Sequence, residues 1–154
     1  MKNKKNINIE YTKNLTNITE NQLTDFFAGW KTPPDPSTHL KILQKSYRVY
    51  LAIDKDTHRV VGFINAISDG VLTVYIPLLE ILKNYQGLGI GSKLVELMLD
   101  ECKDFYMIDI CHDVELTAFY KKFGAMQSCA SIFRNFAMQR GSLTHNNLQS
   151  HNMM

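Results

Sequence analysis

The sequence predicts an α/β domain in which one mixed sheet carries helices on both faces. The chain has 154 residues, enough to bury one core but too few to divide comfortably into two. Its 45% hydrophobic and 21% charged residues are typical of a globular protein. The order of predicted elements is strand, helix, helix, three strands, helix, strand, helix, strand, which requires helices on both sides of a mixed sheet.

The first part of the chain is predicted to contain one strand and two short helices. Residues 7–12 alternate like a strand, and residues 19–22 resemble a capping box that opens a helix through Phe27. The proline-rich segment 29–36 must end that helix, because proline lacks the amide donor and restricts the residue before it. Residues 37–44 follow as a second helix, with Ser37 as its cap.

The central part of the chain is predicted to form a hairpin and a long strand. Residues 47–53 and 59–67 are rich in aromatic and branched side chains and are separated by the polar turn 54–58. Residues 71–82 follow the Asp-Gly turn and form a nearly continuous apolar run. We expect this run to be a strand that is buried on both faces for part of its length.

The last part of the chain is predicted to close the sheet. Residues 89–102 show helical spacing of apolar side chains, 105–111 form a strand, 113–123 a helix and 130–138 a closing strand. We place the single domain at residues 1–140. Residues 141–154 are rich in Asn, His, Gln and Ser, and we expect this tail to be mobile.

Composition excludes several classes of protein. A net charge of +2 without a long basic block argues against nucleic-acid binding. The longest apolar run, residues 71–82, is shorter than the ~20 residues of a membrane helix, and the N-terminus lacks the apolar core of a signal peptide. Cys102, Cys111 and Cys129 show neither disulfide nor metal-ligand spacing. We therefore expect a cytoplasmic protein with reduced thiols, no metal and no membrane partner.

A glycine-rich turn lies between the long strand and the following helix. It reads Gln86-Gly87-Leu88-Gly89-Ile90-Gly91 and is followed by Ser92. Free amides and the positive end of a helix dipole at such a turn bind phosphate groups, and glycine lets a phosphate approach the backbone. Gln86 could brace the turn through its side-chain amide. The sequence therefore predicts a site for a ligand that carries phosphates.

Three other interpretations fit parts of this turn. The first is a glycine-rich loop that serves folding only. The second is a dinucleotide fingerprint, Gly87-x-Gly89-x-x-Ser92 with Asp109 as the ribose ligand, although about half of the chain precedes it. The third is a P-loop, which fails because Lys93 is not in the required order. A nicotinamide-dependent oxidoreductase is thus disfavoured.

Two motifs resemble the GNAT superfamily of N-acetyltransferases. Gln86 to Gly91 is similar to that family's (Arg/Gln)-x-x-Gly-x-(Gly/Ala), and residues 113–120 with Gly124 resemble its Asn-x-x-Ala-x-x-(Phe/Leu)-Tyr helix and following glycine. Asp113, Leu116 and Lys83 depart from the common residues of the family. The resemblance implies a mostly antiparallel sheet of about six to seven strands, splayed between strands 4 and 5.

The resemblance also implies acetyl-CoA as co-substrate and direct transfer of its acetyl group to a primary amine. The pantetheine arm would pair with the backbone of the fourth strand, and the turn would hold the phosphates. The implied cofactor-binding residues are Leu79, Ile81, Leu82, Gln86, Gly87, Leu88, Gly89, Ile90, Gly91 and Ser92.

Two side chains are candidates for catalysis. Tyr120 matches the family's general acid, and its alternative role is packing beside Phe119. Glu80 interrupts an apolar strand and is the first candidate for the general base, with a solvent-facing charge as the alternative. Asp109 and Asp113 are further candidates for the base.

The acceptor amine is expected to enter under the first two helices. Phe26, Phe27 and Trp30 could wall its site, although such clusters more often belong to the core. The sequence indicates a small-molecule or peptide amine without distinguishing between them, and leaves a homodimer open. A non-catalytic acyl-CoA sensor is the alternative function.

Overall fold

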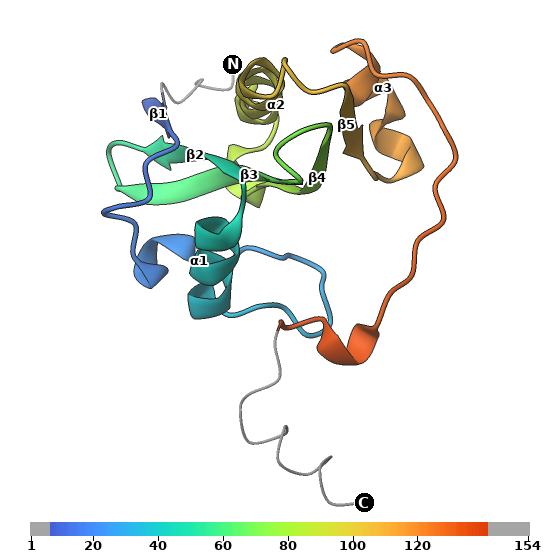
Figure 1. The fold of residues 1–154 in the computed structure, drawn as a ribbon. Helices are drawn as coiled ribbons and strands as arrows, with labels where there is room; N and C mark the ends of the chain where they lie inside the picture. The colour runs from blue at the N-terminus through green and yellow to red at the C-terminus, as the bar shows by residue number, and fades with distance from the viewer. Residues whose placement is uncertain (1–6, 142–154) are drawn as a thin grey trace, which may run out of the picture.

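Five strands form one sheet in the computed structural model, which describes residues 7–141 (Figure 1). The strands lie in the order of the chain, and all neighbours are antiparallel except the last two, which are parallel. They are β1 (Ile9–Thr12), β2 (Arg48–Asp54), β3 (Arg59–Ser68), β4 (Thr73–Ile81) and β5 (Met107–Ile110). The predicted mixed, mostly antiparallel sheet is thus confirmed.

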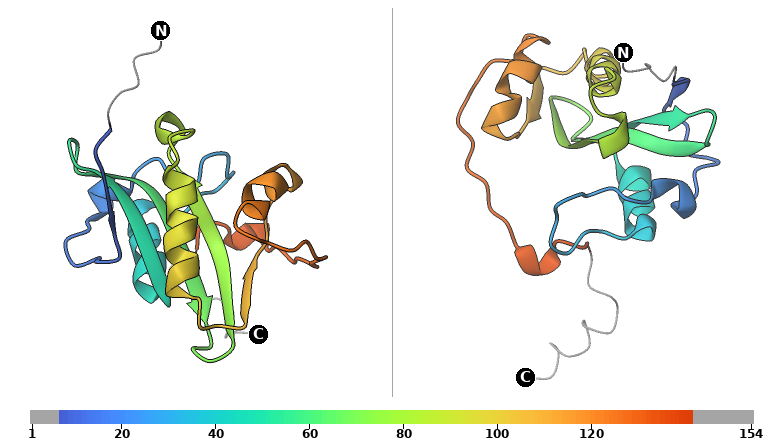
Figure 2. Two further views of the ribbon diagram at one scale, coloured as in Figure 1. Left: turned by 90° about the horizontal axis from the view of Figure 1, so that it is seen from above. Right: turned by 180° about the vertical axis from the view of Figure 1, so that it is seen from behind.

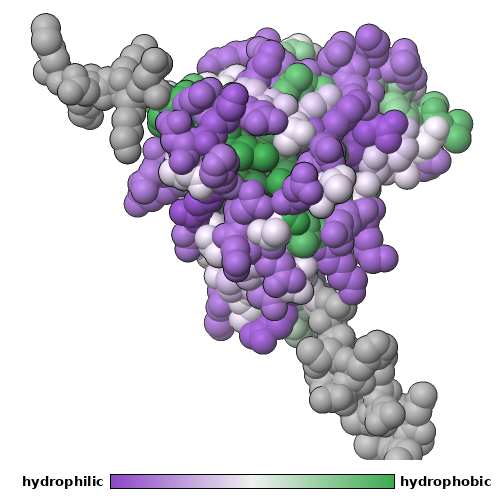
Figure 3. All heavy atoms as spheres, turned by 90° about the vertical axis from the view of Figure 1, so that its left-hand side faces the viewer, coloured by the Kyte–Doolittle hydropathy of each residue, from purple (hydrophilic) through white to green (hydrophobic). Residues whose placement is uncertain are grey.

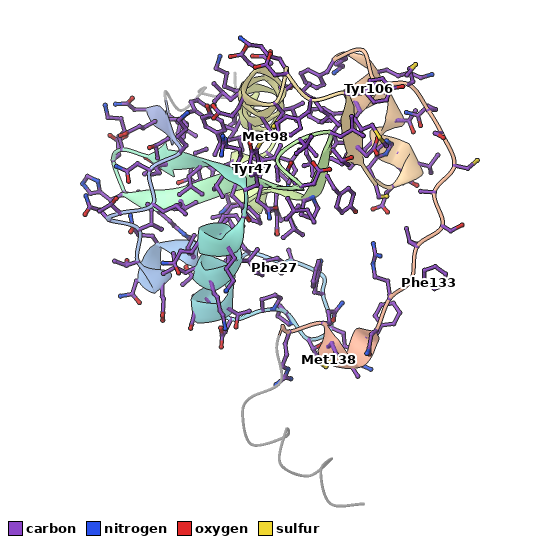
Figure 4. All side chains as sticks on the ribbon, viewed as in Figure 1. Phe27, Tyr47, Met98, Tyr106, Phe133 and Met138 are labelled. Carbon is purple, nitrogen blue, oxygen red and sulfur yellow. The ribbon has the colours of Figure 1, made fainter. Side chains whose placement is uncertain are left out.

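Helices cover both faces of the sheet, as predicted (Figure 2). On one face lie the 3₁₀ turn η1 (Glu20–Leu23) and α1 (Pro36–Lys45), and on the other lies α2 (Ile90–Glu101). Leu94 and Met98 of α2 are fully buried. Figure 4 shows Met98 on the side of α2 that faces the sheet. The remaining elements are η2 (Lys83–Tyr85), η3 (Val114–Leu116), α3 (Thr117–Lys121) and η4 (Phe136–Met138).

The predicted helix from residue 19 to Phe27 shortens to the single turn η1. Asp25 and Phe27 both have positive φ angles, which a right-handed helix excludes. The carboxylate of Glu80 accepts hydrogen bonds from the backbone of this segment, so a distant strand holds it out of a helix. The second helix begins at Pro36 because Asp35, and not Ser37, caps it through the amide of Thr38 (2.7 Å).

The predicted closing strand, residues 130–138, does not form, so residues 7–141 contain five strands in place of the expected six or seven. Residues 125–135 form neither helix nor strand and pass around the outside of the molecule (Figure 1). A strand requires a neighbour with which to exchange backbone hydrogen bonds, and the described part of the chain supplies none for this segment. The predicted helix 113–123 is likewise divided into η3 and the short α3.

Two further expectations concern the ends and the surface of the chain. The expected mobile tail, residues 141–154, lies outside the described residues except for Gly141. None of the helices between residues 7 and 141 is long and apolar enough to cross a membrane.

Candidate functional site

The sheet opens between β4 and β5. The two strands pair from Thr73 to Ile76 of β4, and β4 then continues to Ile81 without β5 beside it. The register between β3 and β4 also shifts here, which places an extra residue on β4 next to Pro77. Because a bulge bends a strand and proline has no amide to donate, the ladder to β5 ends at this point. The predicted splay is therefore present.

The splay exposes particular backbone groups of β4. The amide of Leu82 donates to Val61 O on β3 (2.9 Å), so the alternate residues Leu79 and Ile81 direct their amides and carbonyls away from β3. The carbonyl of Ile81 accepts from Nε2 of Gln86 (2.9 Å), which braces the glycine turn against β4. Leu82 has no free backbone group at the splay, because its amide donates to Val61 and its carbonyl accepts from the Tyr85 amide (2.8 Å).

The glycine turn places free amides at the beginning of α2. Gly87 and Gly89 have φ angles of 74° and 82°, the left-handed conformation that glycine adopts at little cost. The first helical bond runs from Lys93 N to Gly89 O (3.0 Å), so the amides of Ile90, Gly91 and Ser92 have no acceptor within the helix. They add to the positive end of the helix dipole.

A cavity of about 490 Å³ lies between this turn, β4 and α3. Most residues expected to bind the cofactor line it, whereas Leu82 does not, and Leu88 is exposed outside it. The hydroxyl of Tyr85 fixes one wall by donating to the buried Asp54 (2.7 Å). The lining consists of Leu79, Ile81, Tyr85, Gln86, Gly87, Gly89, Ile90, Gly91, Ser92, Leu116, Phe119 and Tyr120.

A second cavity of about 420 Å³ lies on the other side of the splay. Phe27 and Trp30, two of the candidate acceptor residues, line it with their rings edge to face (centroids 5.1 Å apart). Phe26 does not line it and packs in the core against His39 and Phe63 instead. The two cavities share four wall residues, Leu79, Gln86, Leu116 and Tyr120.

Tyr120 is the ionisable side chain common to both cavities. It is buried, with 6% of its surface exposed, and its ring stacks on His112 (centroids 4.7 Å apart). Burial raises the pKa of its phenol to about 12. Its hydroxyl thus stays protonated at neutral pH and is suited to donate a hydrogen bond to a group that gains negative charge.

Glu80 lines the second cavity, and both of its carboxylate oxygens are engaged. They accept from the amides of Phe27 (2.8 Å) and Ala28 (3.1 Å). These bonds hold the strained turn that carries Phe27, whose φ is 63°. Asp113 lines the same cavity, whereas the exposed Asp109 on β5 does not.

His112 was not singled out from the sequence, although the structure places it at the second cavity beside Tyr120. Its Nδ1 lies 2.7 Å from the backbone oxygen of Asp113. A carbonyl can only accept, so Nδ1 carries the proton and the neutral ring has its lone pair on Nε2. A histidine directly after a predicted strand was the one signal available, and it does not reveal which neighbours the side chain meets.

The splayed sheet, with a glycine turn at the beginning of α2, is the architecture of GNAT-type transferases. Residues 15–125 match the model of the Acetyltransferase (GNAT) family, and the chain belongs to this family. Among curated proteins it is similar to the uncharacterized N-acetyltransferase ycf52 of Pyropia yezoensis, with 27% identity over 123 residues, which cover 78% of this chain and 70% of the relative.

Solved structures agree with this assignment. A protein from Deinococcus radiodurans R1, provisionally named an acetyltransferase, has a TM-score of 0.85 and 38% identity. The match covers 88% of this chain and 94% of that one. A GNAT family acetyltransferase from Streptococcus pneumoniae TIGR4 has a TM-score of 0.65 and 25% identity, over 84% of this chain and 98% of that one.

Proposed function

We propose that this protein is an acetyl-CoA-dependent N-acetyltransferase that transfers the acetyl group directly to a primary amine. The observation that supports this most strongly is the position of Tyr120. Tyr120 lines both cavities. The first cavity ends at the free amides of α2, and the second is lined by Phe27 and Trp30. A donor ligand and an acceptor on opposite sides of the splay would both reach this residue.

The first cavity suits the co-substrate. The amides of Ile90, Gly91 and Ser92 would hold its pyrophosphate, because they are free donors at a helix N-terminus. The backbone of Leu79 and Ile81 would bind its pantetheine arm as an added strand would bind. When bound, acetyl-CoA supplies an activated thioester. The amide of Leu79, a residue that lines both cavities, would then donate to the thioester oxygen, on which charge develops during transfer.

Tyr120 would stabilise the leaving thiolate. A phenol with a pKa of about 12 is a weaker acid than an ordinary thiol, whose pKa is about 8.5. Complete proton transfer to the sulfur is therefore unfavourable, and the contribution of Tyr120 is a charged hydrogen bond at the moment when the C–S bond breaks.

The attacking amine must lose a proton as its C–N bond forms. We assign the proton to Nε2 of His112, which has a free lone pair at the acceptor cavity. Glu80, the candidate from the sequence, would act chiefly by holding Phe27 and Ala28 through their amides. Each carboxylate oxygen keeps one lone pair, so Glu80 stays the alternative base.

Two substitutions separate these roles. His112→Asn removes the basic nitrogen at the cavity and is expected to lower kcat/KM by about 10²-fold or more, most strongly for amines of high pKa. Glu80→Gln leaves one acceptor oxygen for two amides, so we expect a higher KM for the amine and a lower Tm. The reverse result, with a selective loss for basic amines in Glu80→Gln alone, would make Glu80 the base.

The function itself is tested by following thiol release from acetyl-CoA with a panel of small and peptide amines. Turnover with at least one amine class supports the proposal and identifies the acceptor. Binding of acetyl-CoA without turnover for any amine would favour an acyl-CoA sensor. Binding of a nicotinamide cofactor in place of coenzyme A would overturn the assignment of the turn.

A further inference from the structure

A segment of apolar side chains passes around the outside of the described molecule. Residues 126–138, here called the arm, follow α3 and form no strand (Figure 1). Four large apolar side chains of the arm are mostly exposed: Met126 (94%), Ile132 (59%), Phe133 (92%) and Phe136 (72%). Single exposed apolar residues are ordinary, but four on one short segment indicate that the segment binds another protein surface.

The arm is held at both ends. At its beginning, Gly124 N donates to Lys121 O (3.0 Å), which closes α3. At its end, Oε1 of Gln139 accepts from both the amide (2.9 Å) and the hydroxyl (3.0 Å) of Thr32, on the opposite side of the sheet from α2. The residues between these anchors are exposed along their length up to Ala137.

A second unsatisfied surface lies at β5. This strand is the edge of the described sheet, so one row of its backbone groups faces outward (Figure 2). Apolar side chains are exposed at its beginning and at the adjoining end of the β3–β4 turn, where Met107 N donates to Leu72 O (3.1 Å). This β5 patch consists of Val71 (81%), Leu72 (49%), Tyr106 (84%) and Met107 (38%).

The opposite side of the molecule differs. Figure 3 shows the side that bears β1, and its surface is mostly hydrophilic, with apolar residues in small separate areas. Figure 4 shows Phe133 on the arm and Tyr106 before β5, on the other side. The exposed apolar arm and the exposed edge of the sheet therefore both lie on the β5 side of the molecule.

We propose that two copies of this chain form a dimer in which each arm lies along the β5 edge and the β5 patch of the other copy. With both anchors kept, an arm presents its apolar side chains to a second molecule. A two-fold axis makes the exchange reciprocal. The arm of each copy then pairs with the β5 edge of the other, so both edges and both arms are covered.

The area involved is sufficient for a stable dimer. A buried phenylalanine contributes about 150–250 Å², so the two phenylalanines, Met126 and Ile132 together bring on the order of 500 Å² per arm. Two arms thus bury on the order of 1,000 Å² before the β5 patches are counted. With the patches, the total reaches the range of about 1,200–2,000 Å² that stable interfaces bury.

Light scattering after gel filtration tests the association. The 154-residue chain is expected at twice its mass of 17.7 kDa. Phe133→Asp should raise the dissociation constant of the dimer by about a hundredfold, because it places an unpaired charge in an apolar contact. Val114→Asp is the matched control: it removes an exposed side chain (78%) outside the arm and the patch and should leave the dimer intact. A monomeric wild type at all concentrations would overturn the proposal.

Native cysteines distinguish exchange from an arm that folds back on its own chain. Cys129 lies on the arm and Cys111 directly follows β5; both are exposed, whereas Cys102 is buried. When Cys111→Ser and Cys129→Ser chains are co-expressed and treated with a short bis-maleimide, we expect a covalent dimer that joins the remaining Cys111 and Cys129. A link within single wild-type chains, with none between the two variants, would show that the arm folds back and would refute the exchange.

Discussion

Replacing Gly91 with glutamate is expected to weaken coenzyme A binding by about a hundredfold while the fold stays intact. A β-carbon at Gly91 would meet Ile81 Cγ1 at 3.6 Å and Phe119 Cζ at 3.9 Å, both ordinary contacts. A carboxylate in the first turn of a helix also favours folding through the helix dipole. Beside a pyrophosphate, however, a like charge at about 5 Å costs about 3 kcal/mol at an effective dielectric constant of about 20. That cost corresponds to about a hundredfold in affinity.

Gly91→Gln is the control for this experiment, because it has the same shape without the charge. Calorimetric titration with coenzyme A measures both variants, and the difference between them should shrink as salt is added. If Gly91→Glu binds as tightly as Gly91→Gln in a folded protein, the phosphates do not lie at this turn. Gly89 is less suitable for the test, since its φ of 82° strains any other side chain.

Local patterns predicted most of the fold. The hairpin of β2 and β3 and the helix α2 form within one or two residues of their predicted bounds, because alternation and helical spacing report burial directly. The turn at Gly87 and Gly89 was also predicted from the sequence, because several glycines between a strand and an amphipathic helix indicate a tight turn. The splay between β4 and β5 was implied by the family resemblance alone, and no local pattern placed it at Pro77, because the break depends on pairing between distant strands.

The main failures depend on tertiary contacts, which local sequence patterns do not report. The segment after η1 leaves the helix, and Glu80, more than 50 positions away, holds it by accepting from the amides of Phe27 and Ala28. The closing strand was predicted from its apolar side chains, but a strand needs a partner, and within residues 7–141 the arm has none. His112 gains a role only through Tyr120, which lies eight positions further along the chain and is brought beside it by α3.

Tyr120→Phe is expected to lower kcat by about 10- to 100-fold with little change in the affinity for coenzyme A. Hydrogen bonds to charged groups contribute about 1.5–3 kcal/mol, and this one forms only as the thiolate leaves. The ring, and with it the stack on His112 and the edge contact with Phe119, is retained. Single-turnover measurement of acetyl transfer isolates the chemical step from product release.

The pH dependence of the decrease in kcat tests whether the hydroxyl of Tyr120 is responsible for it. Because burial raises the pKa of Tyr120 to about 12, its proton is present below that pH and is lost only as the pH rises through it. The ratio of wild-type to Tyr120→Phe rates should therefore stay constant between pH 7 and 10. Tyr50→Phe is the matched control, since its hydroxyl donates to Glu101 away from both cavities and its removal should leave kcat unchanged. An unchanged kcat in Tyr120→Phe would reduce Tyr120 to a packing residue between the two cavities.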